Sequence, residues 1–184
     1  MKKFIISVLG KDRPGIIAAV TQLLFQQDFN IEDVSQTILQ NEFSGIFIVT
    51  GPDGSDPQNV CHALENATVD LKLHIHVKAM DAAPFQWTSA SCEPFVITTR
   101  GPDRKGLVAQ ITAVLAAHNV NVTQLQAVFR GGADPERNVM IYEVDIPADS
   151  DLSKLRTALK TKAAELNLEV NLQHKNIFEA INRI

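Results

Sequence analysis

The sequence predicts an α+β fold built from two copies of one small unit, each with the element order β-α-β-β-α-β. The first observation is an internal repeat: at a constant offset of 91 residues, ten of the 36 positions in residues 4–39 are identical to their counterparts in residues 95–130. The second observation is that apolar residues follow strand and helix periods in the same order within each copy. A repeat of this length indicates two small domains rather than one domain of 184 residues.

Each copy opens with a strand and a helix joined by a polar turn. The apolar runs at residues 4–9 and 95–99 are bounded by a glycine, which is typical of short strands. Apolar side chains then recur at the spacing of a helix with one buried face. These residues are Ile16, Val20, Leu23 and Leu24 in the first copy, and Leu107, Ile111, Val114 and Leu115 in the second.

Two further strands follow, and a second helix and a last strand complete each copy. The second helices are expected to start at Ser55-Asp56-Pro57 and at Ser150-Asp151. The last strands alternate apolar and polar residues over residues 71–78 and 166–173, which predicts one buried side and one solvent-facing side. The middle strands are expected at residues 31–40 and 46–50 around a loop at 41–45, and at residues 122–130 and 139–146 around a loop at 131–138.

This element order is that of a split βαβ, ferredoxin-like domain, in which two helices cover one face of a four-stranded antiparallel sheet. We therefore predict a first domain over residues 1–82, a linker over residues 83–94 and a second domain over residues 95–184. The aromatic residues of the linker indicate that it packs against a domain. The C-terminal tail, residues 176–184, has the apolar spacing of a short amphipathic helix that docks on its own chain.

Composition narrows the class of protein. The chain is 45% hydrophobic and 21% charged, which is ordinary for a globular protein. Its net charge is −4 and it has no cluster of lysines and arginines, so direct binding to nucleic acid is not expected. No apolar run is long enough to cross a bilayer. The two cysteines, Cys61 and Cys92, form no disulfide framework, and we expect a cytoplasmic protein with reduced thiols.

Motifs of catalysis and cofactor binding are missing from the sequence. It has no phosphate loop, no dinucleotide-binding turn, no nucleophile elbow and no zinc-protease helix. His74 and His76 would share one face of a strand and could form half of a metal site. Because no third ligand is indicated nearby, a solvated strand face is the favoured reading. We therefore expect no enzyme activity, no cofactor and no metal.

The turn between the first strand and the first helix carries the same polar residues in both copies. It reads Gly10-Lys11-Asp12-Arg13-Pro14-Gly15 in the first copy and Gly101-Pro102-Asp103-Arg104-Lys105-Gly106 in the second. Free N–H groups at a helix start attract an anion such as a carboxylate. Asp12 could accept hydrogen bonds from an ammonium group, and Asn30, at the next strand, has both a donor and an acceptor. Together these groups could hold the two charged ends of a free amino acid.

Structural roles would explain the same residues. Asp12 and Asp103 could be helix N-caps, and the glycines could serve only the geometry of the turn. The arginines could be solvated or paired with a nearby acid, which contributes little stability. Asn30 and Asn121 could end the helices in a left-handed conformation.

The G-x-D-R-P-G turn, the Asn-Ile or Asn-Val pair that opens the second strand, and the element order resemble the ACT domain. Two such units with nothing else resemble the tandem-ACT regulators of the glycine cleavage system transcriptional repressor group. Many ACT domains are similar in binding amino acids at a domain–domain interface through this turn and the next strand. The resemblance assigns ligand binding to Gly10, Asp12, Arg13, Pro14, Gly15, Ile16, Asn30 and Ile31, and to Asp103, Arg104, Gly106, Leu107, Asn121 and Val122.

The same resemblance implies a function. It implies a non-enzymatic regulator that senses an amino acid of the glycine or serine type, forms a homodimer and acts through a partner protein such as a transcription factor. A ligand-free interaction module is one alternative, and a small enzyme with a deep polar pocket is another. Because Lys105 replaces Pro14 in the second copy, the first turn is expected to be the better binding site and the second half is expected to favour partner contact.

Overall fold

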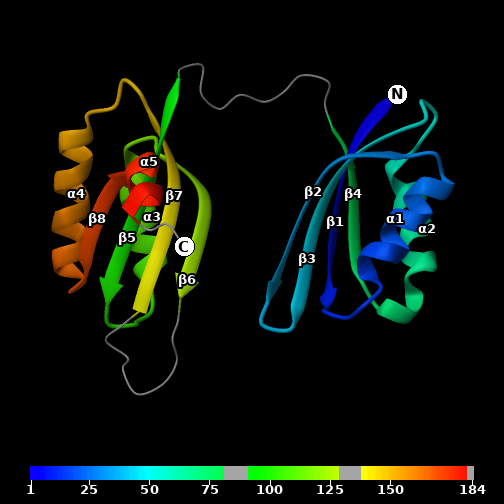
Figure 1. The fold of residues 1–184 in the computed structure, drawn as a ribbon, viewed down its shortest axis with the longest axis horizontal. Helices are drawn as coiled ribbons and strands as arrows, with labels where there is room; N and C mark the ends of the chain where they lie inside the picture. The colour runs from blue at the N-terminus through cyan, green and yellow to red at the C-terminus, as the bar shows by residue number, and fades with distance from the viewer. Residues whose placement is uncertain (81–90, 129–137, 182–184) are drawn as a thin grey trace. The chain divides into compact units, whose positions relative to one another are not determined.

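The computed structural model describes residues 1–80, 91–128 and 138–181. The chain divides into two compact units, Met1–Phe85 and Gln86–Ile184, and each is described by itself (Figure 1). No helix in the described ranges is both long enough and apolar enough to cross a membrane.

The first unit has the predicted β-α-β-β-α-β order. Its sheet has the strand order β2-β3-β1-β4, and each neighbouring pair is antiparallel. Phe4, Ile6 and Val8 of the central strand β1 lie at most 1% exposed beneath the helices, and Phe47 lies beside them on β3. The elements are β1 (Lys2–Lys11), α1 (Ile16–Gln26), β2 (Asn30–Leu39), β3 (Glu42–Gly51), α2 (Pro57–Ala67), the short 3₁₀ helix η1 (Val69–Leu71) and β4 (His74–Ala79).

The second unit repeats this topology with the strand order β6-β7-β5-β8. Its core is built around Ile97, Tyr142 and Leu115, which are at most 1% exposed. The elements are β5 (Cys92–Gly101), α3 (Leu107–Ala117), β6 (Asn121–Val128), β7 (Asn138–Pro147), α4 (Leu152–Glu165), β8 (Glu169–His174) and α5 (Lys175–Ile181). The predicted fold class, two α+β ferredoxin-like units with antiparallel sheets, is therefore confirmed.

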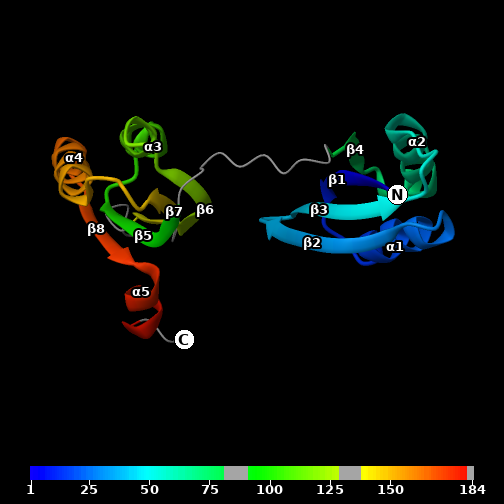
Figure 2. The same cartoon turned by 90° about the horizontal axis from the view of Figure 1, so that it is seen from above.

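A short C-terminal helix covers the second sheet from the other side. Seen from above, α3 and α4 lie on one face of this sheet and α5 lies on the opposite face (Figure 2). Lys175 at the start of α5 donates to Glu143 of β7 at 2.7 Å. Val96 points to the same face and is only 3% exposed. The predicted amphipathic tail helix is thus present and docks on its own unit.

Several predicted boundaries differ from the observed ones. The loop expected at residues 41–45 is wrong, because β2 and β3 are joined through Gln40 and Asn41 alone, and Gln40 has a positive φ of 57°. The strand expected from residue 71 starts at His74, since Leu71 ends the 3₁₀ helix. The strand β5 starts at Cys92, inside the predicted linker, because Cys92–Pro94 pair with Asp145–Pro147.

The loop predicted at residues 131–138 between the middle strands of the second unit extends one residue too far. Asn138 belongs to β7 and pairs with Gly101, whereas the prediction put it in a polar loop. The rest of that loop, residues 131–137, lies outside the described residues, as do both aromatic residues of the linker.

Candidate functional site

Glycine, not aspartate, caps the first helix of each unit. Gly15 precedes α1 with a φ of 98°, and Gly106 precedes α3 with a φ of 87°. Neither helix has a side chain that accepts from its first N–H groups. The reading of Asp12 and Asp103 as N-caps is therefore wrong, and the amides at both helix starts are available to an anion.

The second helices of the two units show what a side-chain cap looks like in this chain. Asp56 accepts hydrogen bonds from the second and third residues after it at 3.0 and 3.1 Å, and Asp151 does the same at 3.1 Å. These are the helix starts expected from the sequence. The contrast indicates that the repeated glycine turns leave their helix ends open.

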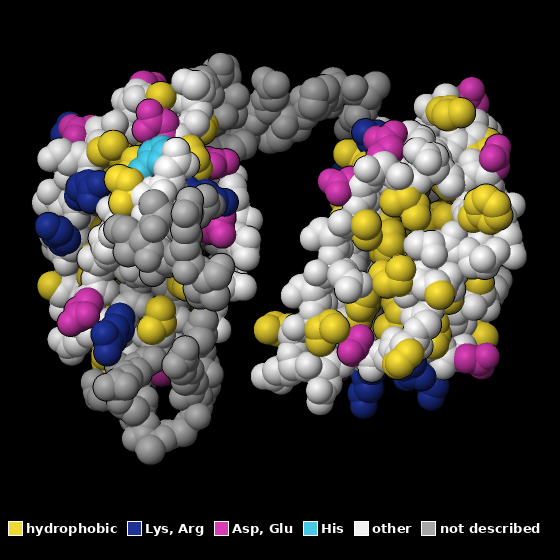
Figure 3. Space-filling view, viewed as in Figure 1, with side chains coloured by type: hydrophobic (Ala, Val, Ile, Leu, Met, Phe, Trp, Pro, Cys, Tyr) yellow, Lys and Arg dark blue, Asp and Glu magenta, His cyan; other side chains and the backbone are white. Residues whose placement is uncertain are grey.

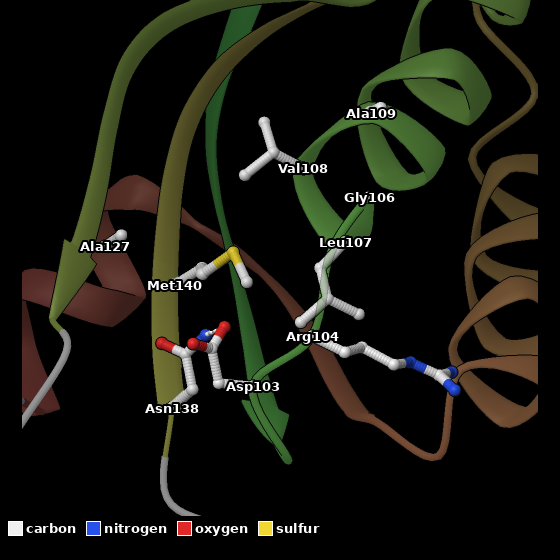
Figure 4. Close-up of a pocket in the computed structure, with 9 residues that line it drawn as sticks. All are labelled: Asp103, Arg104, Gly106, Leu107, Val108, Ala109, Ala127, Asn138 and Met140. Atoms are coloured by element: carbon white, nitrogen blue, oxygen red, sulfur yellow. Dashed lines mark hydrogen bonds between the residues drawn. The ribbon is translucent and has the colours of Figure 1, made fainter. Parts of the chain in front are cut away.

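A groove lies beside the turn of the second unit. Its volume is about 570 Å³, it is open to solvent, and its walls come from the turn, the start of α3 and the facing strands β6 and β7 (Figure 4). The lining residues are Asp103, Arg104, Gly106, Leu107, Val108, Ala109, Ala127, Asn138 and Met140. One end of the groove is thus polar, and its wall is lined by small or flexible apolar side chains.

The polar end of the groove is a paired carboxylate and amide. The Nδ2 of Asn138 donates to Oδ1 of Asp103 at 3.1 Å (Figure 4). Asn138 is only 7% exposed, and its Oδ1 has no hydrogen-bond partner among the described residues. A carboxylate and a side-chain amide therefore lie together in the groove that the start of α3 also lines. The arrangement can receive a cation and an anion that belong to one small molecule.

The arginine of each turn points away from this polar end. Arg104 donates to the carbonyl of Glu165 at the end of α4, and its guanidinium group extends to the other side of the turn in Figure 4. Arg13 donates to the carbonyl of Asp70 in the same way, and both distances are 3.4 Å. Both arginines therefore tie the turn to the end of the second helical segment, and neither is paired with an acid among the residues that the structure describes.

The asparagines that open the second strands lie far from the turns of their own units. Asn30 pairs with Thr50, whereas the turn follows Lys11, which pairs with Glu42. Eight residues along β3 separate these positions, roughly 26 Å at the rise of a strand. Asn121 pairs with Asp145 at the far end of β7 from Asn138. The expectation that Asp12 and Asn30 form one cradle within a unit is therefore wrong.

Those asparagines do not end the helices in a left-handed conformation either. The residues with positive φ just after α1 and α3 are Asp28 and Asn119, at 61° and 55°. Ile31 and Val122, the next residues in the assigned set, are partly buried and pack against the core of their units. Within one unit the structure thus gathers the turn residues around the groove and leaves the strand-start residues out.

Comparisons with known proteins identify the family. The family model described as the ACT domain matches residues 2–78 and 93–173. The chain belongs to the ACT domain family. It is 27% identical to the glycine cleavage system transcriptional repressor of Escherichia coli over 94% of this chain and 90% of that protein. Each of the two units is therefore one ACT domain.

Other relatives match one unit or the whole fold. A UPF0237 protein of Methanococcus maripaludis is 37% identical over 50% of this chain and 99% of its own length. A crystal structure of a protein from Galdieria sulphuraria superposes with a TM-score of 0.76 at 24% identity, over 94% of this chain and 98% of that one. A structure described as a candidate glycine cleavage system transcriptional repressor gives 0.70 at 20% identity, over 94% and 96%. These structures share the tandem ACT fold.

Five residues of the ACT groove were missed by reasoning from the sequence: Val108, Ala109, Ala127, Asn138 and Met140. Asn138 and Met140 were not selected because the segment that follows the constant offset of 91 ends before them, at residue 130. Strand register restores the match: Gly10 pairs with Phe43, and its counterpart Gly101 pairs with Asn138. The correspondence between the two units at this position is therefore visible only once the strand register is known.

The remaining candidates of the sequence lie outside the groove. His74 and His76 are exposed on β4, and no group of three potential metal ligands occurs within the described parts of the chain. Cys61 is half-buried and its Sγ donates to the carbonyl of Ile75 at 3.4 Å, and burial raises the pKa of this thiol. None of these groups has the surroundings of an activated nucleophile.

Proposed function

We propose that this tandem ACT protein is a non-enzymatic regulator that binds a free amino acid in the groove beside Asp103. The observation that carries the proposal is Asn138, whose buried Oδ1 has no partner among the described residues and whose Nδ2 is paired with a carboxylate in the groove that the start of α3 also lines. An α-amino acid supplies both matching groups, an ammonium with three donors and a carboxylate. The similarity to a glycine cleavage system repressor is what favours glycine or serine among the amino acids.

Binding of this ligand changes the affinity for a partner protein through linkage. The similarity to the Escherichia coli repressor supports a partner that regulates transcription of genes of amino-acid metabolism. The net charge of −4 supports action through such a protein rather than through direct contact with nucleic acid. The protein acts in the cytoplasm as a homodimer, with the turn of one copy facing a second copy of the chain.

Isothermal titration calorimetry of the full chain against each of the twenty amino acids tests the binding. At least one small amino acid is expected to release or absorb heat and to raise the Tm in a parallel thermal scan. A ligand at 100 times its Kd stabilises the native state by about 2.7 kcal/mol, which is a shift of several degrees. If no amino acid binds, the sensor function is refuted. Sedimentation with and without the ligand measures the oligomeric state.

A ligand-free interaction module is the second candidate, and one surface favours it. Large apolar side chains on the strands of the first unit are exposed, and Figure 3 shows apolar side chains gathered over that unit. They include Leu9, Leu39 and Ile46, which are between 45% and 76% exposed and lie on the face of the sheet away from the helices. Such a patch is typical of protein contact. Partner binding that ignores every amino acid would support this second candidate.

A further inference from the structure

We propose that the two ACT units are not equivalent, and that the second unit alone binds ligand because Asn138 occupies the position that Phe43 fills in the first. The proposal rests on the function above and names the residue that decides which turn is competent. It reverses the expectation that the first turn is the better site.

The strand registers establish which residues correspond. Gly10 of β1 pairs with Phe43, and Gly101 of β5 pairs with Asn138. Two residues further along, the partner in β3 is Gly45, and in β7 it is Met140. Because both β1 and β5 follow the constant offset of 91, these pairs occupy the same place in the two sheets.

In the first unit an aromatic ring fills this place. Phe43 is 2% exposed. A Cβ atom added to Gly45 would lie 2.9 Å from Cζ and 3.0 Å from Cε1 of Phe43, so the ring covers the glycine where the second unit has the Met140 side chain. A phenylalanine ring offers no lone pair to an ammonium group. Asp12 therefore lacks the second acceptor that Asp103 has.

In the second unit the same place is polar. Asp103 is an acceptor when ionised, so the amide of Asn138 must direct Nδ2 toward it and Oδ1 away from it. A buried acceptor without a partner is costly, which means that a bound donor gains more here than at an exposed site. An ammonium group bound at the free carboxylate oxygen of Asp103 satisfies that acceptor, and it reaches the buried Oδ1 of Asn138 once this side chain turns toward the groove.

The residues that pack beneath this position are also more polar in the second unit than in the first. Val8 and Phe47 of the first unit correspond to Thr99 and Tyr142 of the second. The hydroxyl of Tyr142 donates to Sδ of Met140 at 3.2 Å. Burial raises the pKa of this phenol, an effect that the neighbouring Thr99 hydroxyl partly offsets, so the group stays a neutral donor. The polar network holds Met140 in place at the groove wall.

Calorimetry of the full chain with glycine and L-serine, extended to any amino acid that binds in the screen, gives the stoichiometry. One ligand per chain is expected. Asn138→Leu removes the free acceptor at similar volume, and we expect at least a tenfold weaker affinity with no loss of Tm. Phe43→Leu is the matched substitution in the first unit, and we expect it to lower the Tm while changing affinity less than twofold.

A second pair of variants locates the site independently of Asn138. Asp103→Ala is expected to weaken binding at least tenfold, while Asp12→Ala keeps the affinity of the unaltered chain. Two ligands per chain, or loss of binding with Asp12→Ala but not with Asp103→Ala, would overturn the inference and leave the proposed function standing. Absence of binding to the unaltered chain would instead refute the proposed function itself.

Discussion

At the scale of single residues, the repeated turn has the same backbone conformation in the two units, but different side chains surround it. Gly15 and Gly106 both hold the left-handed conformation that starts a helix without a side-chain cap. The importance of these glycines for the turn could be predicted from the sequence, because both copies have them at the same position. It could not predict that Asn138 faces Asp103, because that contact joins residues 35 apart through a strand pairing whose register only the folded sheet defines.

Replacing Gly106, which caps α3, with a larger residue should lower the stability of the fold. Gly106→Ala places a Cβ in a left-handed conformation, and we expect a loss of about 1–2 kcal/mol of unfolding free energy. Gly54→Ala is the control, because Gly54 has no positive φ and no atom within 4 Å of an added Cβ. Urea unfolding of both variants measures the difference. An equal effect of the two substitutions would contradict the role of the left-handed cap.

At the scale of the elements, periodicity predicted which segments are strands and helices but not where each begins. Residues 41–45 were read as a loop because they contain polar residues and a glycine, yet Gly45 is a strand residue kept small by the Phe43 ring above it. The helix starts at Asp56 and Asp151 were found because capping is a local interaction, decided within three residues of sequence. The other boundaries of strands and loops depend on contacts between residues far apart in the sequence.

The cap of α4 makes a contribution to stability that depends on pH. Backbone amides, that of Lys154 first, lower the pKa of Asp151 below its ordinary value. A carboxyl group whose pKa is lower in the folded than in the unfolded state stabilises the fold above the unfolded pKa, and this stabilisation is lost as the pH falls through the folded pKa. Asp151→Ala should therefore lower the Tm at neutral pH and make a smaller difference near pH 2. A Tm difference that is the same at both pH values would exclude the carboxylate as its source.

At the scale of the whole molecule, the chain contains two copies of one fold, and the copies differ in the side chains that pack beside the turn. Both units share strand order, helix placement and the glycine turn, which is why the tandem fold could be predicted from the repeat. The position beside the turn is apolar in the first unit and polar in the second. If the proposed ligand binds in the groove of the second unit, the duplication has separated a structural or contact unit from a sensing unit.

Ligand binding should accordingly protect one unit and not the other. If the amino acid binds only beside Asp103, amides of β5 to β8 should exchange more slowly in its presence, by about a hundredfold at 100 times the Kd. Amides of β1 to β4 should exchange at the same rate with and without ligand, because the first unit has its own core and its turn is filled by Phe43. Hydrogen exchange with detection by mass spectrometry resolves the two units in one experiment. Equal protection of both units would show that the duplication retained two sites, and slower exchange confined to the first unit would place the sensor at Asp12.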